Sequence, residues 1–228
     1  MKTIKKWEFN KSVADDFDNM LNNSIPYYET LKELIFNIGR HFSNKGNVLD
    51  IGCGTGTTIE PLVKICQSKF FLIDNSAPML EKCMLRFKDN HNVFINNCDI
   101  TKGIPVIDNL SLAISCLTIQ FVPICFRQRI IDSIYDNLSP GGAIILVEKI
   151  ICEDSEINEI VTDEYYNIKR KHYTDIQIIQ KSTELKNVLV PLTLNQNIQL
   201  IKNSGFCKVD VFWNSLNFAA LIARKTNN

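Results

Sequence analysis

The chain has no excess charge of either sign. Its 25 Lys and Arg residues are balanced by 25 Asp and Glu residues, so the formal net charge is zero. A surface that follows nucleic-acid phosphates needs a basic excess, and the balance therefore disfavours nucleic acid as a partner. No apolar run approaches the roughly 18 residues of a membrane span, and the first residues lack the apolar core of a signal peptide. We therefore expect a cytoplasmic protein with no membrane partner.

Three common sequence signals of ligand binding are also missing. The eight cysteines (53, 66, 83, 98, 116, 125, 152 and 207) show no C-x-x-C spacing and lie mostly in apolar runs, which predicts buried thiols. The three histidines, at 41, 91 and 172, are too dispersed to complete a metal site, so we expect no metal. The sequence Gly-Lys-Ser/Thr is absent, which leaves a phosphate-binding P-loop without support.

Short apolar runs alternate with helical patterns along the chain. Runs with turn-rich borders predict buried strands at 47–51, 69–74, 93–98, 110–117 and 143–148. Between the second and third runs, an apolar repeat with helical spacing follows Ser76, whose hydroxyl can cap the helix, and Pro78 falls in the first turn. This alternation predicts a doubly wound α/β fold with a mostly parallel sheet covered on both faces.

Two further runs, 208–213 and 218–224, bring the expected sheet to seven strands. Residues 214–217 between them are too few for a helical crossover, so these strands must form an antiparallel hairpin at one end of the sheet. Residues 1–42 look helical, with a break at 24–28, and residues 152–185 form a polar helical insertion. No repeat or linker divides the chain, and we predict a single domain, 1–228, with 1–42 as a helical N-terminal lid.

The loop at 48–56, Val-Leu-Asp-Ile-Gly-Cys-Gly-Thr-Gly, joins the first predicted strand to its helix. Gly52, Gly54 and Gly56 allow a tight turn and the close approach of a ligand to the backbone. Thr57 and Glu60 fit a capping box, which predicts that the helix begins directly at the loop. A glycine-rich turn by itself is weak support for a ligand site, and its context must decide.

Three acidic residues follow strands around this loop. Asp74 ends the second predicted strand, where an open α/β sheet places a carboxylate that accepts ribose hydroxyls. Asp99 ends the third strand and is placed to accept from an adenine amino group. Together with Asp50 these carboxylates disfavour an anionic dinucleotide and favour an adenosine that carries a sulfonium and an ammonium group.

With these features the chain resembles the class I S-adenosylmethionine-dependent methyltransferases, which have a Rossmann-like sheet with a terminal hairpin. Within them it is most similar to the carboxy-S-adenosylmethionine synthase family, and the similarity covers nearly the whole chain. The matching segments are Phe9, 24–26, 73–76 with Met79, 117–121, 138–142, 148–149, Tyr173, 180–181, 187–188, 205–206 and 217–218. The resemblance implies S-adenosyl-L-methionine as cofactor and a homodimer. In that family a carboxyl group from prephenate is transferred to the cofactor for wobble-uridine modification in tRNA.

The chain departs from that family at three positions. The family's arginine that pairs with the extra carboxylate of the cofactor is replaced by Ser182, and its asparagine after the fourth strand is replaced by Cys116. Gly54 is the residue of ordinary methyltransferases where the synthases have serine. A serine hydroxyl cannot replace the permanent charge and planar donors of an arginine, and a buried carboxylate without a cation costs several kcal/mol. The departures favour the parent cofactor over its carboxylated form.

The predicted cofactor-binding residues come from the loop, the strand ends and the resemblance. They are Tyr28, Asp50, Gly52, Cys53, Gly54, Gly56, Asp74, Asn75, Met79, Asp99, Ile100, Ser115 and Cys116. Some have structural alternatives: Asp50 could organise only the loop amides, Tyr28 could mark a helix corner, and Asn75 could cap a helix.

The catalytic residues are not identified by the sequence. Methyl transfer from a sulfonium can proceed by positioning alone, so no acid or base is required. The weak candidates are Tyr28, Cys116, His172 and Tyr173, against the alternatives of a buried thiol and exposed helical side chains. The segment 169–171, Lys-Arg-Lys, is predicted to be a solvated face. The fourth strand is followed by neither Asp/Asn-Pro-Pro-Tyr/Phe nor Pro-Cys, which disfavours methylation of nucleic-acid bases.

We therefore expect an enzyme that transfers the methyl group of S-adenosyl-L-methionine to a small-molecule acceptor and releases S-adenosylhomocysteine. The segments 1–42 and 152–185 are expected to close over the site and select the acceptor. Two alternatives stay open, namely carboxyl transfer as in the synthase family and a non-catalytic S-adenosylmethionine-binding partner protein.

Overall fold

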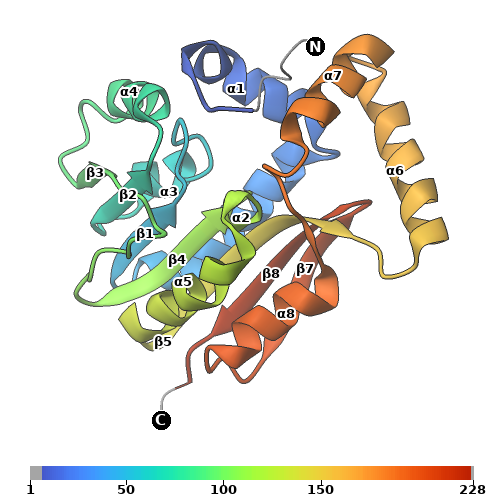
Figure 1. The fold of residues 1–228 in the computed structure, drawn as a ribbon. Coiled ribbons are helices and arrows are strands. Elements are labelled where there is room, and N and C mark those ends of the chain that lie inside the picture. The colour runs from blue at the N-terminus through green and yellow to red at the C-terminus, as the bar shows by residue number, and fades with distance from the viewer. Residues whose placement is uncertain (1–6, 227–228) are drawn as a thin grey trace.

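The computed structural model describes residues 7–226 and is built around one eight-stranded sheet (Figure 1). The strands are β1 (Asn47–Ile51), β2 (Phe70–Asp74), β3 (Val93–Asn97), β4 (Leu110–Cys116), β5 (Leu138–Ile151), β6 (Leu192–Thr193), β7 (Val209–Ser215) and β8 (Phe218–Arg224). Their order is β3-β2-β1-β4-β5-β8-β7, and β6 pairs with β5 beside this path. The strand order reverses at β1, so the carboxyl ends of β1 and β4 border the crevice where such folds bind ligands.

The sheet is parallel up to β5 and antiparallel at its end. β8 lies between β5 and β7 and runs antiparallel to both, which confirms the predicted hairpin. β5 is longer than predicted because it extends from Leu138 to Ile151, through the segment with Gly141 and Gly142. The eighth strand, β6, was not predicted, since its two residues carry no periodic signal of their own.

Helices cover the sheet on both faces, as a doubly wound fold requires. One core cluster contains buried residues of α2 (Tyr28–Ser43), α3 (Glu60–Ile65) and α4 (Ala77–Arg86). The other contains buried residues of α5 (Ile124–Asn137) and α8 (Leu194–Asn203). The central strands β1 and β4 and the middle of β5 are almost completely buried between these layers, which explains why they appear in the sequence as continuous apolar runs. The edge strands β3 and β7 are partly exposed.

The structure confirms the predicted N-cap of α4 but not the predicted capping box of α3. Ser76 caps α4 by accepting a hydrogen bond from the Met79 backbone N–H, as predicted. The capping box predicted at Thr57 and Glu60 is wrong, because α3 begins only at Glu60 and its N-cap residue makes no side-chain hydrogen bond. Glu60 instead forms ion pairs, one of them with Arg86 at 2.8 Å.

The N-terminal segment and the insertion lie over the carboxyl ends of the strands. The segment contains α1 (Lys11–Ser24) and the insertion contains α6 (Ser155–Lys169) and α7 (Asp175–Leu185). They meet where the Trp7 backbone N–H donates to the Glu184 carbonyl at 3.1 Å. The predicted break after α1 is confirmed by Tyr27, which has a left-handed φ of 56°. Residues 1–6 of the predicted lid lie outside the described residues.

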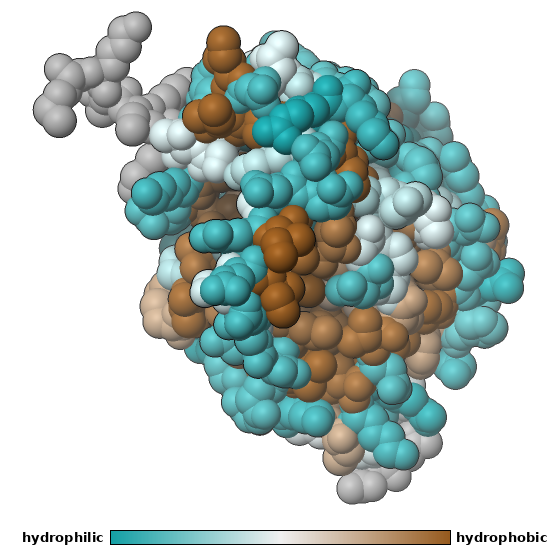
Figure 2. Space-filling view, turned by 90° about the vertical axis from the view of Figure 1, so that its right-hand side faces the viewer, coloured by the Kyte–Doolittle hydropathy of each residue, from teal (hydrophilic) through white to brown (hydrophobic). Residues whose placement is uncertain are grey.

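Apolar side chains remain exposed on the side of the molecule where α6 and α7 lie (Figure 2). On these helices they are Ile157, Ile160, Ile176 and Ile179. Among the helices within 7–226, none is both long and apolar enough to cross a membrane.

Candidate functional site

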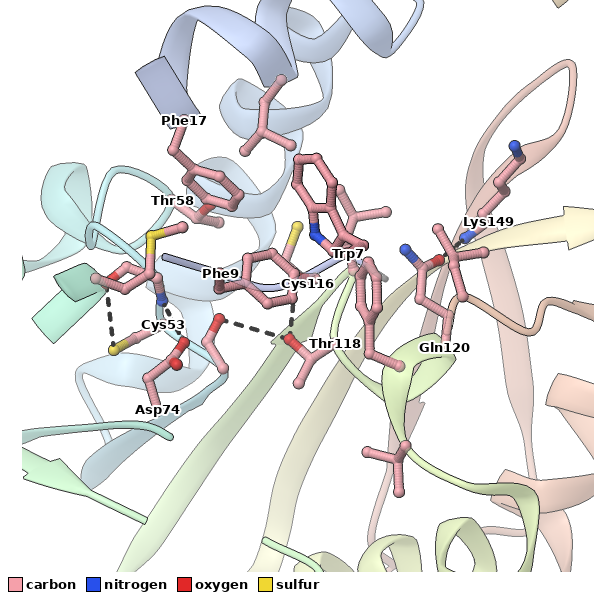
Figure 3. A pocket seen from close by; sticks show the side chains of 18 of the residues that line it. Trp7, Phe9, Phe17, Cys53, Thr58, Asp74, Cys116, Thr118, Gln120 and Lys149 are labelled. Atoms are coloured by element: carbon pink, nitrogen blue, oxygen red, sulfur yellow. Dashed lines mark hydrogen bonds between the residues drawn. The ribbon is translucent and has the colours of Figure 1, made fainter. Parts of the chain in front are cut away.

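A cavity of about 430 Å³ opens at the carboxyl ends of β1, β2 and β4. Its walls come from the glycine loop, from α1 and the residues before it, and from the insertion with α6 and α7. Figure 3 shows Cys53 and Asp74 at one end of this pocket and Gln120 and Lys149 at the other. The predicted lid and insertion therefore both border the predicted loop.

The glycine loop has a backbone that only glycine adopts without strain. Gly52, Gly54 and Gly56 have φ values of 69°, 54° and 82°. A side chain at Gly52 would also overlap the Thr118 side chain, and one at Gly54 would meet the ring of Phe17. The loop is thus held between β4 and the lid, with its backbone facing the cavity.

Asp50 provides a buried negative group at the base of the loop. Asp50 is 2% exposed, and its Oδ2 atom has no hydrogen-bond partner among the described residues. Burial, together with the charge of Asp74, raises the pKa of Asp50 to about 7. A cationic group bound in the cavity would supply the missing partner, so the site fits the ammonium group of S-adenosylmethionine.

The other two predicted carboxylates also line the cavity. Asp74 accepts hydrogen bonds from the backbone N–H groups of Gly54 at 2.9 Å and Ser76 at 2.8 Å. Asp99 accepts from the backbone N–H and hydroxyl of Thr101, at 3.0 and 2.6 Å. Each carboxylate oxygen has a second lone pair, so these bonds fix the side chains and leave them able to accept from a ligand.

Tyr28 and Cys116 both line the cavity, as does Thr58. The Tyr28 hydroxyl is 3.5 Å from the Thr58 hydroxyl. Burial raises the pKa of both Tyr28 and Cys116 far above the neutral range. Both therefore stay protonated, and neither supplies a base at neutral pH. They remain contacts for the cofactor or the acceptor.

Most of the predicted cofactor residues line this one cavity. They are Tyr28, Asp50, Gly52, Cys53, Gly54, Asp74, Asn75, Met79, Asp99, Ile100 and Cys116. Gly56 and Ser115 do not line it. Ser115 is completely buried, because neighbouring residues of a strand point to opposite faces and Cys116 faces the cavity.

The remaining catalytic candidates lie outside the cavity lining. His172 is exposed in the turn between α6 and α7, which agrees with its structural alternative. The hydroxyl of Tyr173 is buried and has no hydrogen-bond partner in the part of the chain that the structure describes, and Lys169 Nζ lies 5.7 Å from the centroid of its ring. Neither residue is placed to deprotonate a molecule in the cavity.

Three lysines of the cavity were missed by the sequence analysis. Lys149, Lys169 and Lys181 all contribute to its lining. The prediction that 169–171 form a solvated face is wrong for Lys169, which is 7% exposed, whereas Lys171 is exposed. Lys149 and Lys181 belong to segments that carried the family resemblance, and this was the only available signal for them.

Arg86 of α4 connects α1 of the predicted lid to the glycine loop through hydrogen bonds. Its guanidinium donates to the Asp18 carboxylate of α1 at 3.0 Å, to Glu60 at 2.8 Å and to the Thr55 carbonyl at 2.8 Å. Phe9 and Phe17, from the same segment as Asp18, lie over the cavity. Arg86 thus links the glycine loop to α1, the helix of the predicted lid.

Two buried ionisable residues near the end of β4, Glu148 and Arg127, do not line the cavity. The Glu148 carboxylate is buried and accepts the Ile119 backbone N–H at 3.0 Å. Burial raises the pKa of Glu148 to about 8. Arg127 is also buried and donates to the carbonyls of Val122 and Val190, both at 2.8 Å. These bonds hold the backbone after β4 against the segment that follows α7.

Comparison with known proteins agrees with this geometry. Residues 48–142 match the model of a methyltransferase domain. Carboxy-S-adenosyl-L-methionine synthase of Methylococcus capsulatus is 37% identical over 95% of this chain and 93% of its own length. The protein of the same name from Campylobacter hominis is 35% identical over 97% and 95%.

Solved structures show the same fold. The DhpI complex with S-adenosylhomocysteine aligns with a TM-score of 0.65 at 16% identity, over 96% of this chain and 94% of that one. A putative S-adenosyl-L-methionine-dependent methyltransferase of Methanococcus maripaludis gives a TM-score of 0.64 at 21% identity, over 100% and 99%. The protein has the fold of an enzyme that binds S-adenosyl-L-methionine. The chain belongs to the carboxy-S-adenosyl-L-methionine synthase family, within the class I S-adenosylmethionine-dependent methyltransferases.

Proposed function

We propose that the protein transfers the methyl group of S-adenosyl-L-methionine to a small-molecule acceptor. The observation that carries the proposal is the position of Ser182, where the synthase family has its carboxylate-binding arginine. Ser182 is exposed, its hydroxyl is 3.3 Å from that of Tyr166, and it does not line the cavity. The cofactor end of the cavity is instead lined by Asp50 and Asp74, which suit the cationic parent cofactor.

The proposed reaction needs little more than positioning. The bound cofactor supplies an electrophilic methyl group on a sulfonium. The residues of this chain hold the cofactor at the glycine loop, exclude water with Phe9 and Phe17, and align the acceptor. Since Tyr28 and Cys116 stay protonated, the favoured acceptor atom is one that needs no strong base.

Carboxyl transfer is the second candidate, because relatives with that name align along almost the whole chain. In that reaction prephenate would lose CO2 and its ring hydroxyl as hydroxide and become aromatic. The hydroxide would take one proton from the methyl group of the cofactor, and the resulting ylide carbon would bond to the CO2 to give the carboxylate. The loss of the arginine at position 182 and of the asparagine at position 116 argues against it. Among residues 7–226, the basic groups of the cavity lining that could replace the arginine are Lys149, Lys169 and Lys181.

One experiment separates the two reactions. The purified protein is incubated with cofactor carrying a trideuterated methyl group, once with prephenate and once with the small-molecule fraction of a cell extract. We expect a trideuteromethyl product and S-adenosylhomocysteine in the extract reaction, detected by mass spectrometry. Carboxylated cofactor formed from prephenate over many turnovers would refute methyl transfer as the function. Cofactor binding without turnover in either reaction would refute both and leave a non-catalytic binding protein.

A further inference from the structure

Three lysines from separate elements converge at the end of the cavity away from the glycine loop. They are Lys149 of β5, Lys169 in the last turn of α6 and Lys181 of α7, and we call them the lysine cluster. Lys149 Nζ lies 4.6 Å and Lys169 Nζ 5.4 Å from the centroid of the same ring, that of Tyr165. Lys181 Nζ lies 4.3 Å from the Trp7 ring centroid. In Figure 3, Lys149 is at the opposite end of the pocket from Asp74.

No carboxylate of the described residues forms an ion pair with the lysine cluster. Within residues 7–226, the ion pairs that form include none of its three members. Glu148 precedes Lys149 but points to the other face of the sheet, toward the Ile119 N–H. The charges of Asp16 and Glu184 raise the pKa of Lys181 by attraction at a distance, without forming an ion pair with it.

The cluster is energetically unfavourable in the free protein. Burial lowers the pKa of Lys149 and of Lys181 to about 8, and in both cases the charge of Lys169 adds to the effect. Buried like charges without a counter-ion destabilise a fold and are usually found where a ligand neutralises them. The missing partner is therefore a negative group.

A second observation points to the same ligand chemistry. Trp7 lines the cavity. Its indole Nε1 atom is buried and has no hydrogen-bond acceptor among the described residues. An indole N–H can only donate, so it also lacks an acceptor atom. Gln120, which accepts the Lys149 backbone N–H at 2.7 Å, also lies at this end. Its neighbours in the lining include the apolar side chains of Phe121, Leu185, Leu189 and Phe218. The occupant should combine an acid group with a flat apolar body.

We infer that the lysine cluster binds an acid group of the methyl acceptor, so that the substrate is a small apolar carboxylate or phosphate ester. This inference rests on the proposed function and assigns the two ends of one cavity to opposite charges. The carboxylates at the glycine loop hold the cationic cofactor, and the lysine cluster holds the anionic acceptor at the other end. Such a division also orients the acceptor, since its acid group cannot occupy the acidic end.

The test measures binding of simple probes to the complex with S-adenosylhomocysteine. Benzoate, phenyl phosphate and the neutral benzamide are titrated calorimetrically at constant ionic strength. At least one of the two acids should bind about tenfold or more tightly than benzamide, and the preferred acid identifies carboxylate or phosphate. Lys149→Gln and Lys169→Gln should each reduce the preference to threefold or less, whereas the exposed Lys171→Gln should retain it. Unchanged S-adenosylhomocysteine affinity verifies that each variant is folded.

Two results would overturn the inference. One is equal binding of acids and benzamide by the unmodified protein, and the other is a preference for acids that survives both Lys149→Gln and Lys169→Gln. The proposed function is tested separately by product analysis. A neutral methylated product would overturn the acid-binding role alone, whereas acid binding together with turnover of prephenate would overturn methyl transfer and keep the cluster as an anion site.

Discussion

Replacing Asp50 with asparagine should stabilise the cofactor-free protein and weaken cofactor binding. Burial raises the pKa of Asp50 to about 7, against about 3.9 for a free aspartate side chain. Each tenfold change in proton affinity is worth about 1.4 kcal/mol, so the ionised side chain destabilises the free fold by about 4 kcal/mol above pH 7. A buried amide without partners costs about 1–3 kcal/mol. The net gain in unfolding free energy is therefore about 1–3 kcal/mol at pH 8.

The sign of the pH dependence follows from the raised pKa. The neutral form of Asp50 is favoured in the folded state, so its stabilising effect is complete below about pH 4 and is lost as the pH rises toward about 7. Denaturant unfolding of the cofactor-free protein between pH 5 and 8 measures this loss. The unmodified protein should lose stability relative to Asp50→Asn across that range, since asparagine does not titrate.

Cofactor affinity provides the opposite readout. The carboxylate is expected to pair with the ammonium group of the cofactor, and a hydrogen bond to a charged group contributes about 1.5–3 kcal/mol. Asp50→Asn should therefore raise the Kd for S-adenosylmethionine roughly 10- to 100-fold. In the unmodified protein the affinity should also rise with pH up to about 7, because the carboxyl group must ionise to pair.

Glu148→Gln is the matched control for this substitution. Glu148 is also buried with a pKa raised to about 8, but it does not line the cavity. Its substitution should alter stability with little change in cofactor affinity. The reasoning would be refuted if Asp50→Asn lowered the unfolding free energy at pH 8, or if its cofactor affinity matched that of the unmodified protein.

The remaining predictions concern the lid, the loop and the lysine cluster. Arg86→Ala should release α1 from the loop and raise the dissociation rate of S-adenosylhomocysteine about tenfold by stopped-flow fluorescence, whereas Lys82→Ala, which removes only an exposed ion pair with Asp15, should not. Gly52→Ala, at a φ of 69° against the Thr118 side chain, should abolish measurable cofactor binding in calorimetry; retained binding would contradict the described loop. Lys149→Met should raise the melting temperature at pH 7. In the unmodified protein the buried lysine is neutral only in the folded state between about pH 8 and 10.5, so the unfolding free energy should rise with pH across this range. Lys149→Met should remove this part of the rise. A lower melting temperature would contradict this.

The fold was predictable because its signals are local. The fully buried strands appear as short apolar runs, and the two residues between β7 and β8 cannot form a crossover. Ser76 caps α4 with its own side chain, so this helix start needed no tertiary information. The capping box at the start of α3 was mispredicted, since the Glu60 carboxylate forms an ion pair with Arg86, a residue of another helix.

The end of the cavity at the glycine loop was also predictable, because its residues belong to one loop and to strand ends. Gly52, Gly54, Asp50 and Asp74 face the cavity as the spacing indicated. Ser115 shows the limit of this argument. The sequence located the end of β4, but the direction of each side chain decided that Cys116 and not Ser115 faces the cavity.

The sequence by itself determined the sheet, its hairpin, the glycine loop and the acidic ends of the strands, since neighbouring residues and simple periodicity produce each of them. Only the tertiary structure decided the chemistry of the other end of the cavity. Lys149, Lys169 and Lys181 come from a strand and two helices, and in the sequence each resembles an ordinary surface lysine. They meet only because the insertion folds back over the sheet, which buries their charges together without an ion pair to any carboxylate of residues 7–226.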